Sequence, residues 1–175
     1  MPKSSNKQIE EDEKKVIKLL LEDSRQSPNE IAKKLGFSRQ KAWKIIKQLE
    51  KENKIWGYTA IIGEENNDRT IYFALTKNKI PIFDYIDTII KRAREKCIGE
   101  LDIQVTGTFY LNGSYDWLTI FTAENIKEAK IFCSYLQKHY GDYIERVELL
   151  ESVFTLIKCG KINPELEKMK NFAID

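Results

Sequence analysis

The fold is decided by residues 27–49, which read SPNEIAKKLGFSRQKAWKIIKQL. Ser27 suits a helix N-cap, and Glu30 can return a hydrogen bond to that cap, so the two predict a capping box. Gly36 lacks a Cβ and can take the left-handed conformation that ends a short helix. Ser38 suits the cap of a second helix. The stretch therefore predicts two helices joined by a tight turn.

The second of these helices is expected to run from the Ser38 cap to about Lys51. Its inward face is apolar and consists of Ala42, Ile45, Ile46 and Leu49. A rotation of about 100° per residue gathers polar side chains on the opposite face, namely Gln40, Lys44, Lys47 and Lys51. Such a face is usually only solvated surface, but its position after a capped helix and a glycine turn favours DNA recognition.

A three-helix domain follows if residues 8–22, whose apolar residues recur at near-helical spacing, form the first helix. In a helix-turn-helix the last helix of the pair enters the major groove. Such a motif needs a small residue where its helices cross, a turn glycine and an apolar anchor, which Ala32, Gly36 and Ala42 supply. We therefore predict a helix-turn-helix DNA-binding domain, winged-helix-like, over residues 1–54.

The polar residues of this domain divide into two expected roles. Base edges are within reach of the N-terminal half of the recognition helix, since Arg pairs with guanine and Gln with adenine; this set is Arg39, Gln40 and Lys44. Backbone phosphates are the expected partners of Lys41, Lys47 and Ser27. Ser38, the helix cap, completes the predicted DNA-binding set. Trp43 lies off the apolar stripe, which favours packing against another helix over DNA contact.

The charge distribution also points to an anionic partner for the N-terminal third. Residues 1–60 carry 14 Lys or Arg against 9 Asp or Glu, whereas residues 61–175 carry 15 against 18. The overall net charge of +2 therefore hides a basic N-terminal part. An uneven solvated surface on two domains is the alternative explanation.

The rest of the chain predicts an α/β module. Residues 55–62 read as a strand, and residues 55–68 as a strand and linker that ends the DNA-binding domain. The pattern over residues 69–158 is β-α-β-β-α-β, which packs two helices on one face of an antiparallel, ferredoxin-like sheet. Its elements are expected at 70–76, 82–97, 101–111, 115–122, 125–140 and 146–158. A helical tail is expected over residues 159–175. The predicted fold class is α+β.

Three collinear segments carry a resemblance to a known family. They are NEIAKKLGFS at 29–38, LEKENKIWGYTA at 49–60 and NGSYDWLTI at 112–120. The sequence resembles the Lrp/AsnC, or feast/famine, transcriptional regulators over about residues 8–158. The middle segment is similar to that family's exit from the DNA-binding domain, and the last to its "Gly-Asp-Tyr-Asp-Tyr" hairpin.

The resemblance implies a homodimer built sheet against sheet, in some members assembled into tetramers or octamers, that binds an inverted-repeat operator in double-stranded DNA. It also implies an amino-acid effector held near a hairpin, here Gly113, Ser114, Tyr115 and Asp116. Backbone amides can take an amino acid's carboxylate and Asp116 its ammonium, although Asp116 could equally be a turn residue that satisfies its own backbone.

Several features depart from the family pattern. Ile45 stands where the family usually has Arg, and Leu150 stands in place of a Thr of the last strand. The second change makes the expected effector pocket less polar. The tail after Lys158 is longer than the family's usual end.

Other classes of function find little support. The sequence offers no Ser-His-Asp set, no phosphate-binding glycine loop and no recognisable acid pair, so we expect no enzyme and no cofactor. Cys97, Cys133 and Cys159 are widely spaced and fit reduced thiols rather than disulfides or metal ligands. The single histidine, His139, fits a helix-end surface position. The polar N-terminus and the lack of long apolar runs predict a cytoplasmic protein without membrane contact.

Two alternatives to a sequence-specific regulator stay open. A non-specific architectural DNA-binding protein without a ligand switch would use the same basic helix face. A tetrapyrrole-modifying enzyme is a more distant alternative, because siroheme decarboxylases share the Lrp/AsnC architecture.

Overall fold

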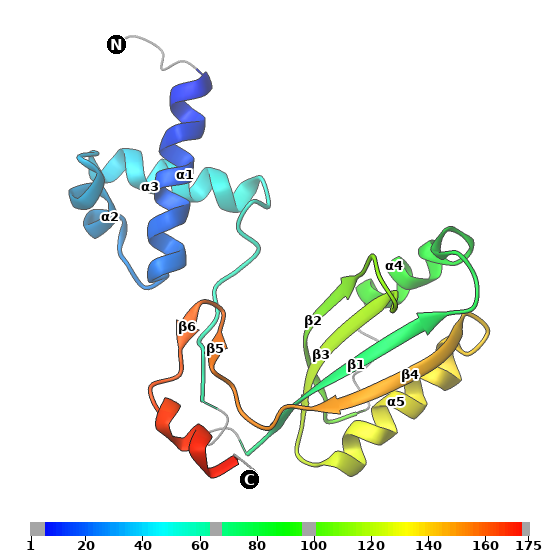
Figure 1. Ribbon diagram of the computed structural model, residues 1–175. Coiled ribbons are helices and arrows are strands. Elements are labelled where there is room, and N and C mark those ends of the chain that lie inside the picture. The colour runs from blue at the N-terminus through cyan, green and yellow to red at the C-terminus, as the bar shows by residue number, and fades with distance from the viewer. Residues whose placement is uncertain (1–5, 64–67, 96–100, 173–175) are drawn as a thin grey trace. The chain divides into compact units, whose positions relative to one another are not determined.

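The computed structural model describes residues 6–63, 68–95 and 101–172. The chain divides into two compact units, Met1–Ala60 and Ile61–Asp175 (Figure 1). The predicted boundary after residue 54 stays a prediction. Three of the expected features lie wholly or partly outside the described residues: Cys97 with the end of its helix, the polar stretch around residues 64–67, and the last residues of the tail.

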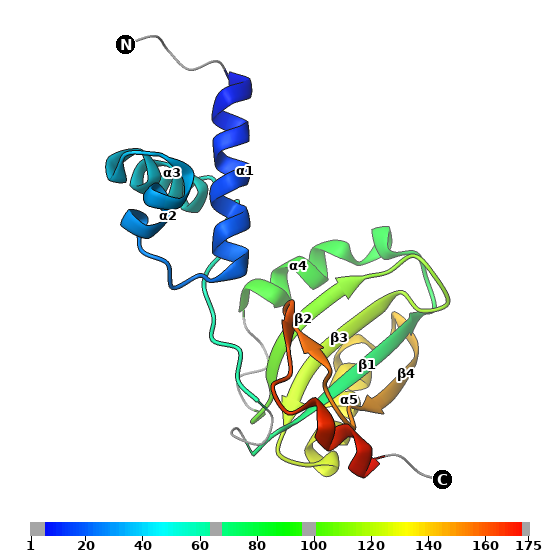
Figure 2. The ribbon, with the colours of Figure 1, turned by 60° about the vertical axis from the view of Figure 1, so that its left-hand side comes forward.

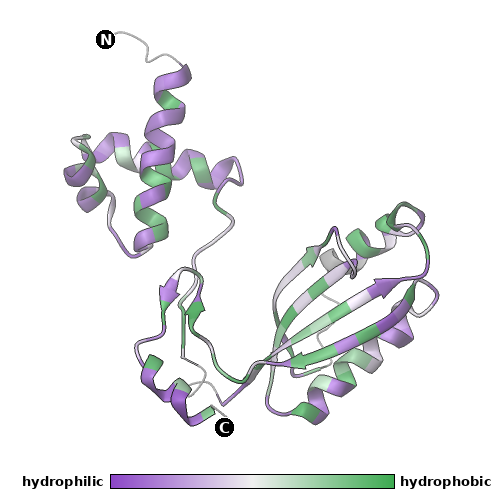
Figure 3. Cartoon of the chain, in the orientation of Figure 1, coloured by the Kyte–Doolittle hydropathy of each residue, from purple (hydrophilic) through white to green (hydrophobic). Residues whose placement is uncertain are grey.

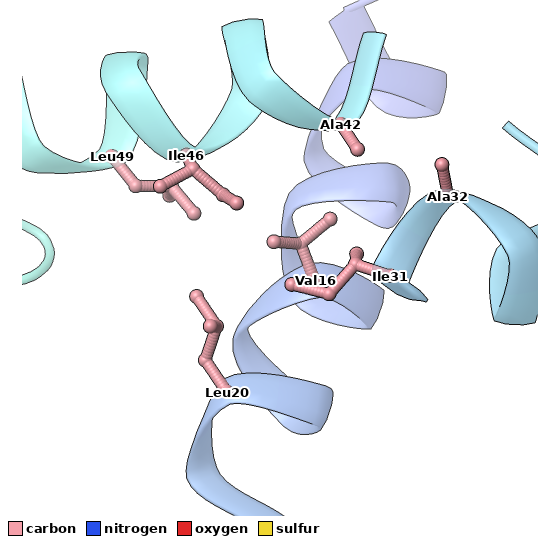
Figure 4. Packing of buried hydrophobic residues seen from close by; sticks show 7 residues of the cluster. All are labelled: Val16, Leu20, Ile31, Ala32, Ala42, Ile46 and Leu49. Carbon is pink, nitrogen blue, oxygen red and sulfur yellow. The ribbon is translucent and has the colours of Figure 1, made fainter. Parts of the chain in front are cut away.

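The first unit is the expected three-helix domain. It consists of α1 (Asn6–Glu22), α2 (Pro28–Leu35) and α3 (Arg39–Lys51). Their apolar faces meet in one buried cluster (Figure 4), made of Val16, Leu20, Ile31, Ala32, Ala42, Ile46 and Leu49. Burial of this apolar surface holds the three helices together. Ile45, at the position where the family has Arg, is partly buried against the same cluster.

Helix α1 buries part of the set that its spacing indicates, including Val16 and Leu20. Hydrophobic and hydrophilic bands alternate along it (Figure 3). Ile9 and Leu21, placed on the apolar stripe by spacing, are exposed at 45% and 75%. Glu13, which the spacing also placed on the stripe, is buried, and so is its neighbour Asp12.

The expected strand at residues 55–62 does not form. The backbone is extended there, yet none of the described residues pairs with it as a strand. Ile55 instead continues from α3, since its N–H donates to Leu49 O at 3.1 Å and its side chain packs on the helical core. A strand needs a ladder partner for its backbone groups, and the sequence pattern of one segment cannot supply it.

The second unit contains the predicted antiparallel sheet. Its strands are β1 (Thr70–Asn78), β2 (Gln104–Tyr110), β3 (Trp117–Ala123) and β4 (Ile144–Glu151). They lie in the order β2-β3-β1-β4, as Figure 2 shows, with every neighbouring pair antiparallel. The element order and the strand order confirm the ferredoxin-like βαββαβ module and the α+β class.

Two helices cover one face of this sheet. Helix α5 (Ile126–Tyr140) starts at the Asn125 cap and buries Phe132 against Phe121, with ring centroids 4.5 Å apart. The other helix begins later than expected: residues Ile82–Asp84 form a 3₁₀ turn, η2, before α4 (Ile86–Glu95). Phe83, counted as inward by its spacing, is 84% exposed, and Tyr85 is buried in its place. The 3₁₀ turn changes the rotation per residue and so moves the inward face.

The last predicted strand, 146–158, is wrong beyond its first half. Strand β4 ends at Glu151, and a separate hairpin follows, β5 (Ile157–Lys158) and β6 (Lys161–Ile162). Its two turn residues, Cys159 and Gly160, have φ of 49° and 75°. The helical tail is the 3₁₀ segment η3 (Leu166–Phe172). No helix in the described ranges is long and apolar enough to cross a membrane.

Candidate functional site

The turn between α2 and α3 has the geometry that the sequence predicted. Ser27 caps α2, and its N–H donates to the Glu30 carboxylate at 2.7 Å while Glu30 N–H donates back to Ser27 Oγ. The Ser27 backbone N–H lowers the pKa of Glu30 and keeps it ionised. Gly36 ends α2 at φ 67°, ψ 29°. Ser38 then caps α3 by accepting from Lys41 N–H at 3.2 Å.

The two serines that we expect to contact DNA therefore also stabilise helices within the domain. The hydroxyls of Ser27 and Ser38 each serve a helix N-terminus. Both residues remain exposed, so either could still approach a phosphate from outside.

Lys41, expected at a phosphate, is held by the protein itself. Its Nζ lies 2.5 Å from Asp12 Oδ2, and it also stands over the Phe37 ring, 4.0 Å from the centroid. Burial raises the pKa of Asp12, but hydrogen bonds from Lys41 and Gln8 outweigh it and leave the pKa lowered. This ion pair joins α3 to α1, so the Lys41 ammonium is already engaged within the protein.

Three further ion pairs, formed by Lys47 and Lys54, lie on the same domain. Lys47 Nζ is 2.7 Å from Glu50 one helical turn on, on the exposed side of α3. Lys54 joins the end of α3 to α1 through Glu13, also at 2.7 Å, and to Glu52 at 2.8 Å. The first pair is exposed and weak, so a phosphate could displace Glu50 from Lys47. The Lys54–Glu13 pair contains a buried carboxylate, and we infer that it stabilises the fold.

The three residues expected at base edges are the ones that the domain leaves unengaged. Arg39, Gln40 and Lys44 are exposed on α3. Within the described part of the chain, no hydrogen bond or ion pair occupies their side chains. Trp43, between them in sequence, is half exposed and is not among the residues of the helical core, and its packing against another helix stays a prediction. The exposed face of α3 thus carries donors that can turn to a ligand.

The hairpin between β2 and β3 differs from the expected tight turn. Six residues, 111–116, separate the two strands, and Gly113 does not have a positive φ. The loop is closed by Leu111 N–H donating to Asp116 O at 2.8 Å. Gly113 and Ser114 are exposed, and the space around Gly113 is open. Tyr115 is partly buried, and its hydroxyl contacts Glu148 and Arg146 of β4.

Asp116 is bound to the neighbouring strand rather than to its own turn. Its Oδ2 accepts from Asn78 N–H at 2.8 Å and lies 3.1 Å from Lys77 Nζ, both at the end of β1. Its backbone N–H donates to Thr76 O at 2.9 Å. A carboxylate in this position could bind an ammonium group, and the ammonium of Lys77 now has that role.

Sequence reasoning missed three residues that shape these sites: Asp12, Lys77 and Asn78. Asp12 looks like one of several acids on a solvated helix, and its partner is 29 positions away. Lys77 and Asn78 end a strand and reach the hairpin only through the sheet register. Nothing in the local sequence marks either pairing.

The structure also locates Leu150 and His139, two residues discussed from the sequence. Leu150 pairs with Phe73 on the sheet face that the helices leave uncovered, and it is 44% exposed. His139 is exposed near the end of α5, where its Nδ1 lies 2.9 Å from Tyr135 O and its ring stacks on Tyr135. The predicted helix-end position of His139 is confirmed.

Comparisons with known proteins agree with this architecture. A family model described as "Winged helix-turn-helix DNA-binding" matches residues 13–55. An uncharacterised HTH-type transcriptional regulator of Pyrococcus abyssi is 34% identical over 107 residues, which are 58% of this chain and 73% of that protein.

Solved structures extend the likeness to both units. An AsnC family transcriptional regulator from Agrobacterium tumefaciens matches with a TM-score of 0.64 at 16% identity, over 89% of this chain and 97% of that one. A feast or famine regulatory protein from Mycobacterium tuberculosis, complexed with L-methionine, matches with a TM-score of 0.67 at 15% identity, over 86% and 95%.

Proposed function

Because this chain belongs to the HTH-type transcriptional regulators, with the Lrp/AsnC fold, we propose that it binds operator DNA sequence-specifically and regulates transcription. The observation that carries the proposal is the exposed face of α3. Arg39, Gln40 and Lys44 are unengaged there, while the opposite face is locked into the helical core. A rigid helix with bidentate donors at its N-terminal half fits base edges in the major groove.

Phosphate contacts would come from residues around these three. Lys47 would exchange its exposed bond to Glu50 for a phosphate, and the capped N-terminus of α2 at Ser27 would approach the backbone. Lys41 is assigned a smaller share, because its ammonium already neutralises the buried Asp12.

We further propose a homodimer formed by the uncovered sheet face. Strand register places two apolar rows on that face: Leu150, Phe73 and Ile120 in one, and Leu75, Leu118 and Phe109 in the next. Phe109 is 51% and Leu150 44% exposed. An apolar sheet face of this kind is typical of an interface, and a two-fold axis would present two recognition helices to an inverted repeat. Larger assemblies, tetramers or octamers, would use other surfaces.

An amino-acid effector at the 111–116 hairpin is the regulatory part of the proposal. The ammonium of Lys77 beside Asp116 marks where an effector's ammonium would bind, so binding would require Lys77 to move away. Exposed Gly113 and Ser114 would offer backbone amides to its carboxylate, and Tyr115 would line the site. The relative complexed with L-methionine supports an amino acid as the class of ligand.

The DNA proposal is tested by measuring affinity for the gene's own promoter and for random DNA of equal length at one salt concentration. A regulator should prefer the promoter by at least about a thousandfold. Equal affinity for both would favour an architectural DNA-binding protein instead. We place the protein in the cytoplasm, with the DNA it would bind.

A further inference from the structure

A partly open cavity lies in the second unit, between the sheet and its two helices. Its volume is about 190 Å³. The sheet contributes Val105 and Trp117, α4 contributes Ile89, and α5 contributes Leu136. The cavity is on the helix-covered side of the sheet and is distinct from the exposed hairpin residues Gly113 and Ser114.

One of the lining residues, Asn78, carries a buried polar atom without a hydrogen-bond partner among the described residues. Asn78 Oδ1 is buried without a partner, whereas the backbone N–H of the same residue donates to Asp116. A buried carbonyl oxygen left unbonded is costly, and such groups in native proteins call for a specific explanation. Because this oxygen is closed to solvent, a ligand in the cavity would reach it only after the Asn78 side chain turns toward the cavity, and an N–H or O–H of the ligand would then supply the partner.

A second polar group lies in the same lining. The Tyr85 hydroxyl accepts from Trp117 Nε1 at 3.3 Å and can still donate its own hydrogen. Burial raises the pKa of Tyr85, so the hydroxyl stays protonated. The cavity thus has an acceptor in Asn78 and a donor in Tyr85, with aromatic rings beside them.

The chemistry of the lining limits the class of ligand. All the described residues that line the cavity are uncharged, and most of them are aliphatic or aromatic. A zwitterionic amino acid would have to bury two charges there without a counter-charge, which is unfavourable. A dry cavity of about 150 Å³ holds benzene, so about 190 Å³ fits a single small ring system.

We infer that this cavity is a second ligand site, separate from the hairpin, that binds a neutral aromatic molecule of about the size of indole with one N–H or O–H donor. The donor binds Asn78 Oδ1 and the ring packs between the sheet and α5. Because Asn78 also binds Asp116, the occupant contacts the residue that anchors the hairpin. The inference does not depend on DNA binding or on an amino-acid effector.

The test uses the full chain and two matched probes, indole, which has an N–H donor, and benzofuran, which has the same shape without one. Titration calorimetry should give indole about tenfold tighter binding, as expected for one hydrogen bond to a buried acceptor. Asn78→Leu should abolish this preference. Leu136→Phe, which fills the cavity, should weaken both probes at least about tenfold, whereas Ile131→Phe, on an exposed position of α5, should change neither.

Three outcomes would overturn the inference. Binding of neither probe up to its solubility limit would mean that the cavity holds only water. Equal binding of both probes to the unaltered chain would show that Asn78 is not the acceptor. Binding that Leu136→Phe leaves intact would place the site elsewhere. Val105→Phe fills the same cavity from the sheet and serves if the Leu136 variant does not fold. Promoter affinity, measured in parallel, tests the DNA proposal separately.

Discussion

Lys41 Nζ lies 2.5 Å from Asp12 Oδ2, which joins the recognition helix to the first helix of its domain through a carboxylate that is only 3% exposed. The pair separates the basic residues of α3 into one that maintains the domain and others that are available to DNA. Two neighbouring lysines of similar exposure, Lys41 and Lys44, should therefore respond differently to substitution.

Replacement of Lys41 should destabilise the domain, and replacement of Lys44 should not. Lys41→Ala leaves Asp12 buried without its cation, and we expect a loss of about 1–3 kcal/mol in the free energy of unfolding, measured by urea denaturation. Lys44→Ala is the matched control and should unfold like the unaltered chain while losing DNA affinity. Equal stability of the two variants would contradict the role given to Asp12.

The same pair predicts a pH dependence. The pKa of Asp12 is lowered from 3.8 in the folded chain, so between the two values the unfolded chain binds more protons. This contribution to stability is complete above about pH 4 and is lost as the pH falls through the folded-state pKa. Unfolding curves between pH 2 and 6 should show a shallower acid loss for Asp12→Asn than for the unaltered chain. If the curves of the two chains run parallel, Asp12 does not contribute to the acid loss of stability, because the other carboxylates are the same in both chains.

Base and phosphate contacts on α3 should differ in sequence dependence. Arg39→Ala or Gln40→Ala should cost about 1–3 kcal/mol at one operator position and relax the preference there. Lys47→Ala should weaken binding to all DNA sequences alike. It should also make the affinity depend less steeply on salt concentration, by the amount expected for about one phosphate contact. Lys18→Ala, on an exposed position of α1, is the control. If all three α3 variants lose the same affinity for every DNA sequence, the result favours a non-specific architectural DNA-binding protein.

The uncovered sheet face should hold the dimer together. Phe109→Asp or Leu150→Asp places a charge in the apolar rows at positions already half exposed in the single chain, so folding should persist while association fails. Sedimentation should then give the 20.5 kDa monomer. Ile131→Asp, at an exposed position on α5, should leave the dimer intact. A Phe109 variant that stays dimeric would place the interface on another surface.

Asp116 should matter for the fold as well as for an effector. Because its carboxylate binds Asn78 N–H and Lys77, Asp116→Ala should lower the unfolding free energy by about 1–3 kcal/mol. Asp116→Asn keeps an acceptor for Asn78 and should be milder.

The effector itself is sought by thermal shift with the twenty amino acids, followed by sizing with any that raises Tm. Both Asp116 variants should lose that response, and binding should change the oligomer size together with Tm. If no amino acid moves Tm or the oligomer size, the effector proposal fails.

Local signals made the N-terminal domain predictable. Ser27, Gly36 and Ser38 each act on neighbours within four residues, so a capping box and a left-handed turn can be read directly from the chain. The succession of strand and helix segments over residues 69–158 likewise predicted the βαββαβ order of the module.

Long-range contacts account for what could not be predicted. At the hairpin of residues 111–116, Asp116 binds to the end of β1, and the local sequence does not reveal this contact. Residues 55–62 have strand composition without a strand partner. The 3₁₀ turn at η2 shifted the buried position from Phe83 to Tyr85, since helical spacing assumes one rotation per residue throughout.

The turn between β5 and β6 presents a thiol that is accessible to chemical labelling. Cys159 is exposed at its tip, whereas Cys133 is half-buried and burial raises the pKa of its thiol to about 11. Thiolates are the form that reacts with maleimides, so in a Cys97→Ser background a dye would couple to Cys159 well before Cys133. The longer tail of this chain thereby provides an attachment point for a fluorescent reporter.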